Sequence, residues 1–276
     1  MKKGLLVLIA LLGAMTVKSE VAFTYEAGAE LQSTYIWRGN YCGGLNLQPS
    51  VSVGYEGEHT WFDFNAWGNI GASDWFFNKE TTFVPELDLT ATFGVHGFTV
   101  GFTHYYYCDG SNFFSWKNIN TVVAEDATSC TEVFGGYDFS ELHEKAGVYI
   151  NWYTTVAGRD ERTDEDSTLH RAYSSYLELG YKYTFENIGL TLNGNIGFSP
   201  WTSEYIYGNE GFAVQCLSLR VEKEWAWDAC SLTLFAQGMM KPSAMQKGNI
   251  FVKAGDPNWV KTDQTLNGTI GLGIWF

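Results

Sequence analysis

The feature that most constrains this chain is an alternation of apolar and polar side chains with a period of two, which recurs from residue 23 to the C-terminus. Residues 86–93 are typical, with Leu87, Leu89, Ala91 and Phe93 separated by acidic and hydroxyl-bearing residues. A period of two indicates β-strands whose two faces meet different surroundings. After residue 19 no apolar run is long enough for a membrane-spanning helix. We therefore expect an all-β protein.

The spacing of the strands separates a barrel from a soluble sandwich, which would alternate in the same way. Strands are predicted to begin near residues 23, 45, 61, 84, 98, 131, 146, 173, 189, 212, 230 and 264. Joins after even-numbered strands are short, as at 57–59 and 95–97, and most joins after odd-numbered strands are long. Outer-membrane barrels have this layout. We predict a closed antiparallel transmembrane β-barrel of about 12 strands, with short periplasmic turns and longer extracellular loops.

The N-terminus has the parts of a secretory signal peptide. Lys2 and Lys3 precede an apolar run that ends near Met15, and Val17 and Ser19 fit a cleavage site after Ser19. The run is too short for a membrane anchor. We expect residues 1–19 to be the signal peptide and 20–276 a single barrel domain. Cleavage would remove three of the 17 Lys and Arg residues and no acid, lowering the net charge from −14 to about −17. This balance argues against a nucleic-acid partner.

The C-terminus carries a second signal. Residues 268–276 alternate and end on Phe276, which resembles the terminal signal that barrel-assembly machinery recognises in outer-membrane proteins. Together with export, this predicts the bacterial outer membrane as the location. The predicted partners are outer-membrane lipids, lipopolysaccharide and the barrel-assembly machinery.

One segment resembles a known family. The run Ser33-Thr34-Tyr35-Ile36-Trp37-Arg38-Gly39 is similar to the Ser-x-Tyr-x-x-Arg-Gly opening of the Gcw_chp family, which are bacterial outer-membrane proteins of unassigned function. The similarity continues at residues 85–89, 104–107 and 131–137, and covers about the first half of the mature chain. The long loops and cysteines of this sequence do not match the family. The resemblance implies a barrel and supplies no activity.

Strand parity indicates which charged side chains face the lumen. The charged lumen candidates are Glu26, Glu30, Arg38, Asp63, Glu86, Asp88, Glu132, Asp138, Glu178, Lys182 and Arg220, with Glu56 and Glu222 on the same faces. Acids outnumber bases in this set. An acidic lumen attracts cations and repels anions. The alternative is structural, because small barrels also fill their interiors with paired charges and water.

Aromatic residues share these inner faces. The aromatic lumen candidates are Trp61, Trp67, Tyr105, Tyr107, Tyr149 and Tyr153, with Phe134 beside them. Rings with polar edges suit sugars or nucleosides, although they can simply fill a tight barrel. Outward aromatics, among them Tyr35 and Trp37, are expected in the interfacial girdles.

These features favour a narrow channel for small polar neutral or cationic solutes. The alternatives are a closed structural or surface barrel without transport and, third, an outer-membrane lipid-modifying enzyme. Catalysis is disfavoured because His104, the one histidine at the right depth, has Thr81 or Thr131 nearby but no well-placed Ser. We expect no enzyme activity, no catalytic residue, no cofactor and no metal site.

Five cysteines remain, and none forms a Cys-x-x-Cys pair. Export would place them where disulfides form. Cys108 and Cys130 bracket the loop between the fifth and sixth predicted strands and are the predicted disulfide, with Cys42 as the rival partner. Cys216 and Cys230 fall on opposite strand faces, which argues against their pairing.

Overall fold

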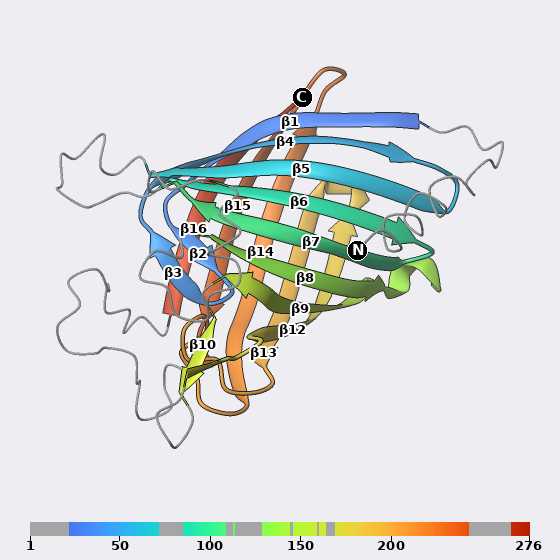
Figure 1. The fold of residues 1–276 in the computed structure, drawn as a ribbon. Coiled ribbons are helices and arrows are strands. Elements are labelled where there is room, and N and C mark those ends of the chain that lie inside the picture. The colour runs from blue at the N-terminus through green and yellow to red at the C-terminus, as the bar shows by residue number, and fades with distance from the viewer. Residues whose placement is uncertain are drawn as a thin grey trace.

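The computed structural model describes residues 22–71, 85–108, 113, 129–143, 146–158, 160–163, 169–242 and 266–276. Twelve of the described strands form a closed antiparallel barrel, which confirms the predicted fold and strand number (Figure 1). Closure leaves no sheet edge, so every wall strand is hydrogen-bonded on both sides, as a membrane requires. The predicted signal peptide lies outside the described residues.

The wall strands are β1 (Ala22–Gln32), β4 (Asn46–Glu56), β5 (Thr60–Gly71), β6 (Glu86–Val95), β7 (Phe98–Tyr107), β8 (Ser129–Asp138), β9 (Val148–Gly158), β12 (Ser175–Phe185), β13 (Leu190–Ser199), β14 (Ala213–Ala226), β15 (Ser231–Met240) and β16 (Leu266–Trp275). Each begins within two residues of its predicted start. The connections hold the hairpins β2 (Tyr35–Trp37) with β3 (Asn40–Gly43) and β10 (Glu161–Thr163) with β11 (Leu169–Arg171), and the 3-10 helices η1 (Phe139–Glu141) and η2 (Glu186–Ile188). In the described part of the chain, no helix has the length and apolarity to cross a membrane.

The two ends of the barrel differ as the sequence predicts. Short turns join β4 to β5, β6 to β7, β12 to β13 and β14 to β15 at one end, and η1 lies in the join from β8 to β9. The tightest is the two-residue turn His96-Gly97, in which both φ angles are positive. The opposite end carries the longer connections, including residues 33–45, 159–174 and 200–212.

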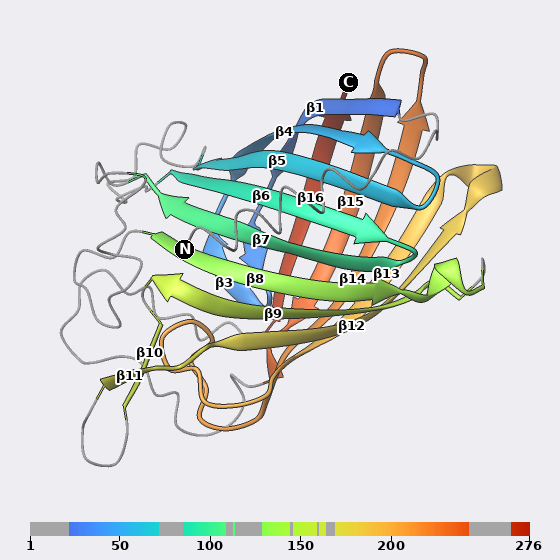
Figure 2. The same cartoon turned by 45° about the vertical axis from the view of Figure 1, so that its right-hand side comes forward.

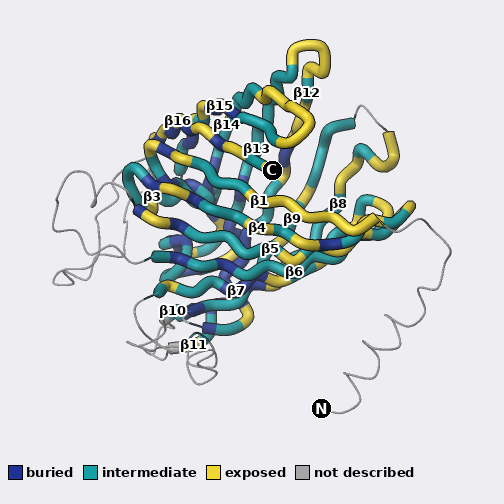
Figure 3. The backbone as a smooth tube through the Cα atoms, turned by 90° about the horizontal axis from the view of Figure 1, so that it is seen from above, coloured by how far each residue is buried: buried dark blue, intermediate teal, exposed yellow. Residues whose placement is uncertain are grey.

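The outside of the barrel is apolar and the inside polar, the reverse of a soluble protein. In β16, Ile270 and Leu272 are 65% and 45% exposed, whereas Asn267 and Thr269 between the outward positions are buried. Buried and exposed positions alternate along the walls in the same way (Figure 3). So large an apolar surface suits lipid rather than water. Other exposed outward residues are Val51, Val53, Phe62, Phe64, Val100, Phe102, Leu179, Leu219 and Leu234.

The chain leaves the wall at Ser33. Its backbone N–H still donates to the carbonyl of Ile270 (2.9 Å), which extends the seam between β1 and β16 by one residue. The next residues turn inward as the β2–β3 hairpin, drawn in blue behind the green strands in Figures 1 and 2. Contacts of this hairpin with β5, β7, β8, β9, β12 and β15 place it inside the barrel.

The hairpin corrects the sequence analysis at three positions. Tyr35 and Trp37 were expected to face lipid and Arg38 to belong to the first wall strand, but β1 ends at Gln32. Tyr35 is instead buried against Trp67, and Trp37 packs against Tyr105, both inside the lumen. Tyr35 and Trp37 keep the parity of the apolar face of β1, and the polar Ser33 between Leu31 and Tyr35 is the one sign at an outward position that the wall strand has ended.

Candidate functional site in the barrel lumen

The tip of the hairpin is a two-residue turn, Arg38-Gly39. Both residues have positive φ angles, 47° and 87°, which is the geometry of the tightest hairpin turns. Gly39 suits this position for a second reason, because a Cβ atom there would lie 2.4 Å from the carbonyl oxygen of Gln215. An arginine rarely adopts a positive φ, at a cost of about 1 kcal/mol. This turn aims the guanidinium across the lumen.

The guanidinium of Arg38 forms a two-pronged ion pair with Glu132 of β8. Nη1 donates to Oε2 at 2.7 Å and Nη2 to Oε1 at 2.8 Å, and both side chains are almost fully buried. Nη1 also donates to the hydroxyl of Tyr207 (2.7 Å). Such paired, charge-assisted bonds combine strength with a fixed orientation.

Aromatic rings enclose this ion pair. The Arg38 Cζ atom lies 4.0 Å from the ring centroid of Tyr153, 4.7 Å from that of Trp37 and 4.8 Å from that of Tyr176. Tyr207 stacks on Trp37, with ring centroids 5.9 Å apart and planes 11° apart. Cation–π contacts strengthen when water is excluded, as it is here. We call Trp37, Arg38, Glu132, Tyr153, Tyr176 and Tyr207 the Arg38 cluster.

Two further contacts hold the hairpin from the β15 side. The backbone N–H of Gly39 donates to the sulfur of Met239 (3.1 Å), and Lys241 Nζ donates to the side-chain oxygen of Asn40 and to the carbonyl of Tyr207. Lys241 follows the last residue of β15. Burial lowers the pKa of Lys241 to about 8, so this ammonium group loses its proton within an accessible pH range.

The loop from β13 to β14 supplies Tyr207 and is itself anchored. Ser203 and Asn209 exchange two backbone hydrogen bonds across this loop. The Ser203 hydroxyl lies 2.5 Å from that of Ser174, which in turn donates to the fully buried carboxylate of Asp160 (2.5 Å). Burial raises the pKa of Asp160. These bonds join the β9–β12 connection, which holds Asp160 and Ser174, to the β13–β14 connection, which holds Ser203.

A second ion-pair group lies on the opposite wall. Arg220 of β14 donates to Glu30 of β1 (3.0 Å) and to Glu222 (2.5 Å), and its Cζ atom lies 3.6 Å from the ring centroid of Phe235. These side chains are less buried than the Arg38 cluster, with 16–29% of each exposed. Here too the carboxylates are neutralised by an arginine.

Another part of the inner wall has carboxylates with no such compensation. Glu86 of β6 pairs in register with Asn69 of β5, and Asp88 with Trp67. In the β4–β5 register, Leu47 pairs with Ile70 and Ser50 with Trp67, which puts Gln48 beside Asn69. We call Gln48, Asn69, Glu86 and Asp88 the polar row. All four are at least 91% buried, and within the described residues no ion pair joins either carboxylate to a basic side chain.

Three atoms of the polar row are buried without a hydrogen-bond partner: Asn69 Oδ1, Asp88 Oδ1 and Gln48 Nε2. Gln48 Oε1 accepts from Gln32 Nε2 (2.8 Å). Glu86 lies within hydrogen-bonding reach of the Tyr35 hydroxyl from the hairpin. The polar row therefore faces the hairpin.

The other charged lumen candidates lie on the predicted strand faces but away from these clusters. Asp63 is half-buried on β5, beside the hydroxyl of Ser52. Glu178 on β12 lies opposite Asn151 in the β9–β12 register. Glu26 and Lys182 are exposed near the short-turn end. Asp138 is exposed, and its carboxylate accepts from the backbone N–H of Ser140 to cap η1.

Some of the aromatic lumen candidates lie around the hairpin, and the others lie elsewhere along the barrel. Trp67, Tyr105 and Tyr153 surround the hairpin, and the Tyr105 hydroxyl donates to Glu132 (3.1 Å). Tyr149 donates to Asn193 (3.1 Å) further along the lumen. Trp61 lies over Gly94 toward the short-turn end, and Tyr107 lies at the end of β7 nearest the long loops.

The predicted Cys108–Cys130 disulfide is not formed. In the β7–β8 register Cys130 faces Tyr105, three residues before Cys108, which separates the cysteines by about 10 Å along the strands. A disulfide needs Cα atoms roughly 4.4–6.8 Å apart. The prediction was wrong because it assumed that the two strand ends are level. None of the described cysteines, Cys42 included, is in a disulfide.

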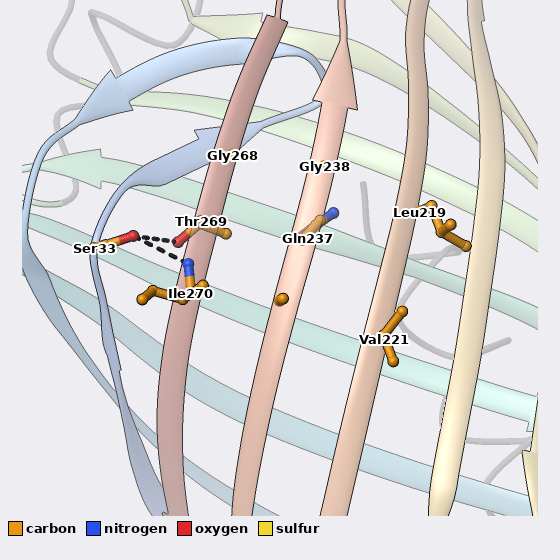
Figure 4. Close-up of a pocket in the computed structure, with 9 residues that line it drawn as sticks. Ser33, Leu219, Val221, Gln237, Gly238, Gly268, Thr269 and Ile270 are labelled. Atoms are coloured by element: carbon orange, nitrogen blue, oxygen red, sulfur yellow. Dashed lines mark hydrogen bonds between the residues drawn. The ribbon is translucent and has the colours of Figure 1, made fainter.

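A shallow groove of about 460 Å³ lies outside the lumen, on β14, β15 and β16 (Figure 4). Gly238 and Gly268 form its floor, and the outward side chains of Leu219, Val221 and Ile270 flank it. Ser33 closes one end through its hydroxyl, which accepts from the backbone N–H of Ile270 (3.0 Å). The groove is a depression in the lipid-facing surface and forms no part of the lumen site.

His104 Nδ1 lies 3.0 Å from the Thr131 hydroxyl on the outward face. Among the described residues, no three His, Cys, Asp or Glu side chains come together as a metal-binding group. The expectation that the chain is not an enzyme stays a prediction.

Sequence reasoning missed Tyr176, Tyr207, Lys241, Gln48 and Asn69. Tyr207 and Lys241 lie in connections, where no periodicity shows which way a side chain points. Gln48 and Asn69 are on the predicted inner faces but are uncharged, so strand parity and charge together do not single them out. The resemblance carried by the Ser-x-Tyr-x-x-Arg-Gly segment implies a barrel but does not predict the hairpin that this segment forms.

Comparisons with known proteins found only distant similarity to solved structures. No protein-family model matches the chain, and no curated protein matches it. The solved structures that match include a chain from a study of the in-meso crystallization of membrane proteins (8% identity, TM-score 0.41, covering 91% of this chain and 83% of that chain). Salmonella typhi OmpF in complex with daunomycin matches at 9% identity and TM-score 0.34, covering 94% of this chain and 97% of that chain. Pseudomonas aeruginosa OccK2 (OpdF) matches at 10% identity and TM-score 0.28, covering 80% of this chain and 55% of that chain. The resemblance to the Gcw_chp family stays a prediction.

Proposed function

We propose that this barrel is a narrow outer-membrane channel for small cationic or neutral polar solutes, constricted by the β2–β3 hairpin. The observation that carries the proposal is the polar row, where two buried carboxylates face the hairpin with no basic partner in the described residues. Uncompensated negative charge in a narrow, low-dielectric passage favours cations and excludes anions. The unpartnered amide groups of the row would exchange hydrogen bonds with a neutral polar solute in transit.

The second candidate is a barrel that is closed in its resting state. The Arg38 cluster favours it, because the hairpin tip is bonded to β8, β9 and β12 across the lumen from its own strand. The two candidates differ in whether solute passes beside the hairpin or only after the hairpin is released.

Conductance in planar bilayers tests both. The channel proposal expects small currents from the unaltered protein, and larger ones after Arg38→Ala and Glu132→Ala free the hairpin tip together. Silence from the unaltered protein with current from the double variant would favour the closed barrel. Silence from both would contradict transport. The matched control is Arg220→Ala with Glu222→Ala, which removes an ion pair but leaves the hairpin contacts in place.

We further propose the outer membrane as the location, with its lipids and lipopolysaccharide around the apolar exterior and barrel-assembly machinery acting on the terminal strand. Phe276 exchanges two backbone hydrogen bonds with Ala27 at the seam, while its side chain is 63% exposed. The exposed ring is free for recognition. Phe276→Lys keeps the backbone bonds, and we expect it to reduce heat-modifiable, membrane-assembled protein. Normal assembly would contradict this part of the proposal.

A further inference from the structure

The polar row has the composition of a binding site for a hard metal ion. Glu86 and Asp88 are two residues apart on β6, so both project inward, with Cα atoms about 7 Å apart. Asn69 lies directly opposite Glu86 in the β5–β6 register. Cross-strand partners have Cβ atoms about 4.5–5.5 Å apart. Three oxygen-bearing side chains thus project from one small patch of wall.

The side chains of the polar row are deeply buried, although some of their polar atoms have no hydrogen-bond partner. Glu86 and Asp88 are 8% and 9% exposed, and Asn69 is 7% exposed. Asp88 Oδ1 and Asn69 Oδ1 accept no hydrogen bond. Burying an acceptor without a partner costs about 1–3 kcal/mol, and burying an unpaired charge costs more. These two oxygens are acceptors, so the partner they lack is a hydrogen-bond donor or a cation; the third orphaned atom of the row, Gln48 Nε2, is itself a donor.

The lumen itself provides the comparison. Glu132 is buried to a similar degree and meets Arg38, and Glu30 and Glu222 meet Arg220. Lys241 donates to Asn40 and to Tyr207, and no ion pair joins it to either carboxylate of the row. Among the described residues, arginines pair with Glu132, Glu30 and Glu222, and none pairs with Glu86 or Asp88.

We propose that the polar row binds a divalent cation, with Ca²⁺ as the preferred ion. The carboxylates of Glu86 and Asp88 and the amide oxygen of Asn69 would be the protein ligands. An all-oxygen set selects hard cations over zinc or copper, and Ca²⁺ tolerates irregular geometry better than Mg²⁺. Water completes the shell, and such a water could accept from the orphaned Nε2 of Gln48. With two carboxylates, we expect a dissociation constant on the order of 10⁻⁴ M.

This inference does not rest on the channel proposal, since a barrel that conducts nothing could hold the ion. The ion would sit beside Trp67, which faces Asp88 in register, and close to Tyr35 of the hairpin. Indole and phenol rings transfer excitation energy to bound Tb³⁺, which replaces Ca²⁺ in oxygen sites. The placement therefore offers a direct optical readout.

The test uses the full-length refolded barrel in detergent. Excitation of the aromatic residues should produce Tb³⁺ luminescence that Ca²⁺ displaces, with Mg²⁺ displacing it more weakly and Na⁺ hardly at all. Glu86→Gln with Asp88→Asn should abolish the signal. The control is Asp63→Asn, which removes an inward carboxylate from β5 away from the row and should leave the signal unchanged. Heat-modifiable migration checks that each variant is folded.

A second variant covers the case in which the double substitution does not fold. Asn69→Leu keeps the side-chain size, removes one oxygen ligand and should weaken Ca²⁺ binding by about tenfold or more. Calorimetric titration with CaCl₂ measures this without luminescence. Absence of Ca²⁺ binding to the unaltered protein, equal binding by Asn69→Leu, or loss of binding in Asp63→Asn would each overturn the proposal.

Discussion

The lumen contains two kinds of buried carboxylate, and they differ in what the chain provides for them. Glu132 forms an ion pair with Arg38, which the rings of the Arg38 cluster enclose, and accepts a hydrogen bond from the hydroxyl of Tyr105. Glu86 and Asp88 share a wall of the same construction and receive no cation from the described residues. Burial alone therefore does not identify a functional charge in a barrel. Compensation separates the carboxylates that hold the structure from those that are available to a ligand.

The largest change in unfolding free energy should come from removing one partner of the Arg38–Glu132 ion pair. Arg38→Ala leaves Glu132 as a buried charge without its partner, and we expect a loss of about 3–5 kcal/mol in unfolding free energy. Urea-induced unfolding in detergent or lipid measures it. Adding Glu132→Gln to the same chain should restore part of the loss, because the orphaned charge disappears. A double variant no more stable than Arg38→Ala would show that the ion pair is not what holds the hairpin.

The hairpin turn offers a smaller backbone test of the same cluster. Gly39→Ala introduces a Cβ atom 2.4 Å from the carbonyl oxygen of Gln215 at a φ of 87°, and should cost about 1–3 kcal/mol. Gly43→Ala is the matched control, because it lies in the same hairpin and its Cβ would meet nothing within 4 Å. Equal stability of the two variants would mean that the turn is not held against the wall.

The uncompensated pair should respond in the opposite direction. With divalent cations chelated, Glu86→Gln with Asp88→Asn removes two like charges from a buried site, and we expect stability to rise by about 1–2 kcal/mol. With excess Ca²⁺ the order should reverse, since binding to the folded state adds about 2.7 kcal/mol to the unaltered protein at 100 times the dissociation constant. If the double substitution lowered the unfolding free energy in the presence of chelator, Glu86 and Asp88 would be stabilising residues, as Glu132 is.

The smallest effect concerns Lys241 and pH. Its pKa is lowered to about 8 by burial, from an ordinary 10.5, so charging it costs the folded state stability below pH 8, and that cost disappears as the pH rises from about 8 to 10.5. The lumen then also loses one positive charge. The ratio of cation to anion permeability should increase between pH 7 and 9, and Lys241→Met should show the high ratio at both values. A pH response that survives in Lys241→Met would come from another group.

The barrel could be predicted from the sequence because, in each wall strand, apolar residues that face outward alternate with polar residues that face the lumen. In β16 the apolar residues Ile270 and Leu272 alternate with Thr269 and Gly271, and such alternation places each strand start within two residues. Strand parity likewise assigned Glu86, Asp88 and Glu132 to inner faces, where the structure has them buried.

The interior could not be predicted to the same depth, for two physical reasons. Tyr35 and Trp37 keep the parity of the apolar face of β1, so a single polar residue at an outward position, Ser33, is too weak a signal to predict the inward turn. The partners of Arg38 lie 94 and 169 residues away in sequence, at Glu132 and Tyr207. These contacts between residues distant in sequence decide which acidic side chains pair with an arginine. The disulfide prediction failed likewise, because it needed the strand register that only the folded barrel fixes.

The measurement that tests the central claim most directly is the reversal potential in a KCl gradient for three proteins: the unaltered chain, Glu86→Gln with Asp88→Asn, and Arg38→Met with Glu132→Gln. The first should select cations, the second should lose most of that preference, and the third, whose net lumen charge is unchanged, should keep it. Anion selectivity in the unaltered protein, or full selectivity after neutralising the polar row, would contradict the account.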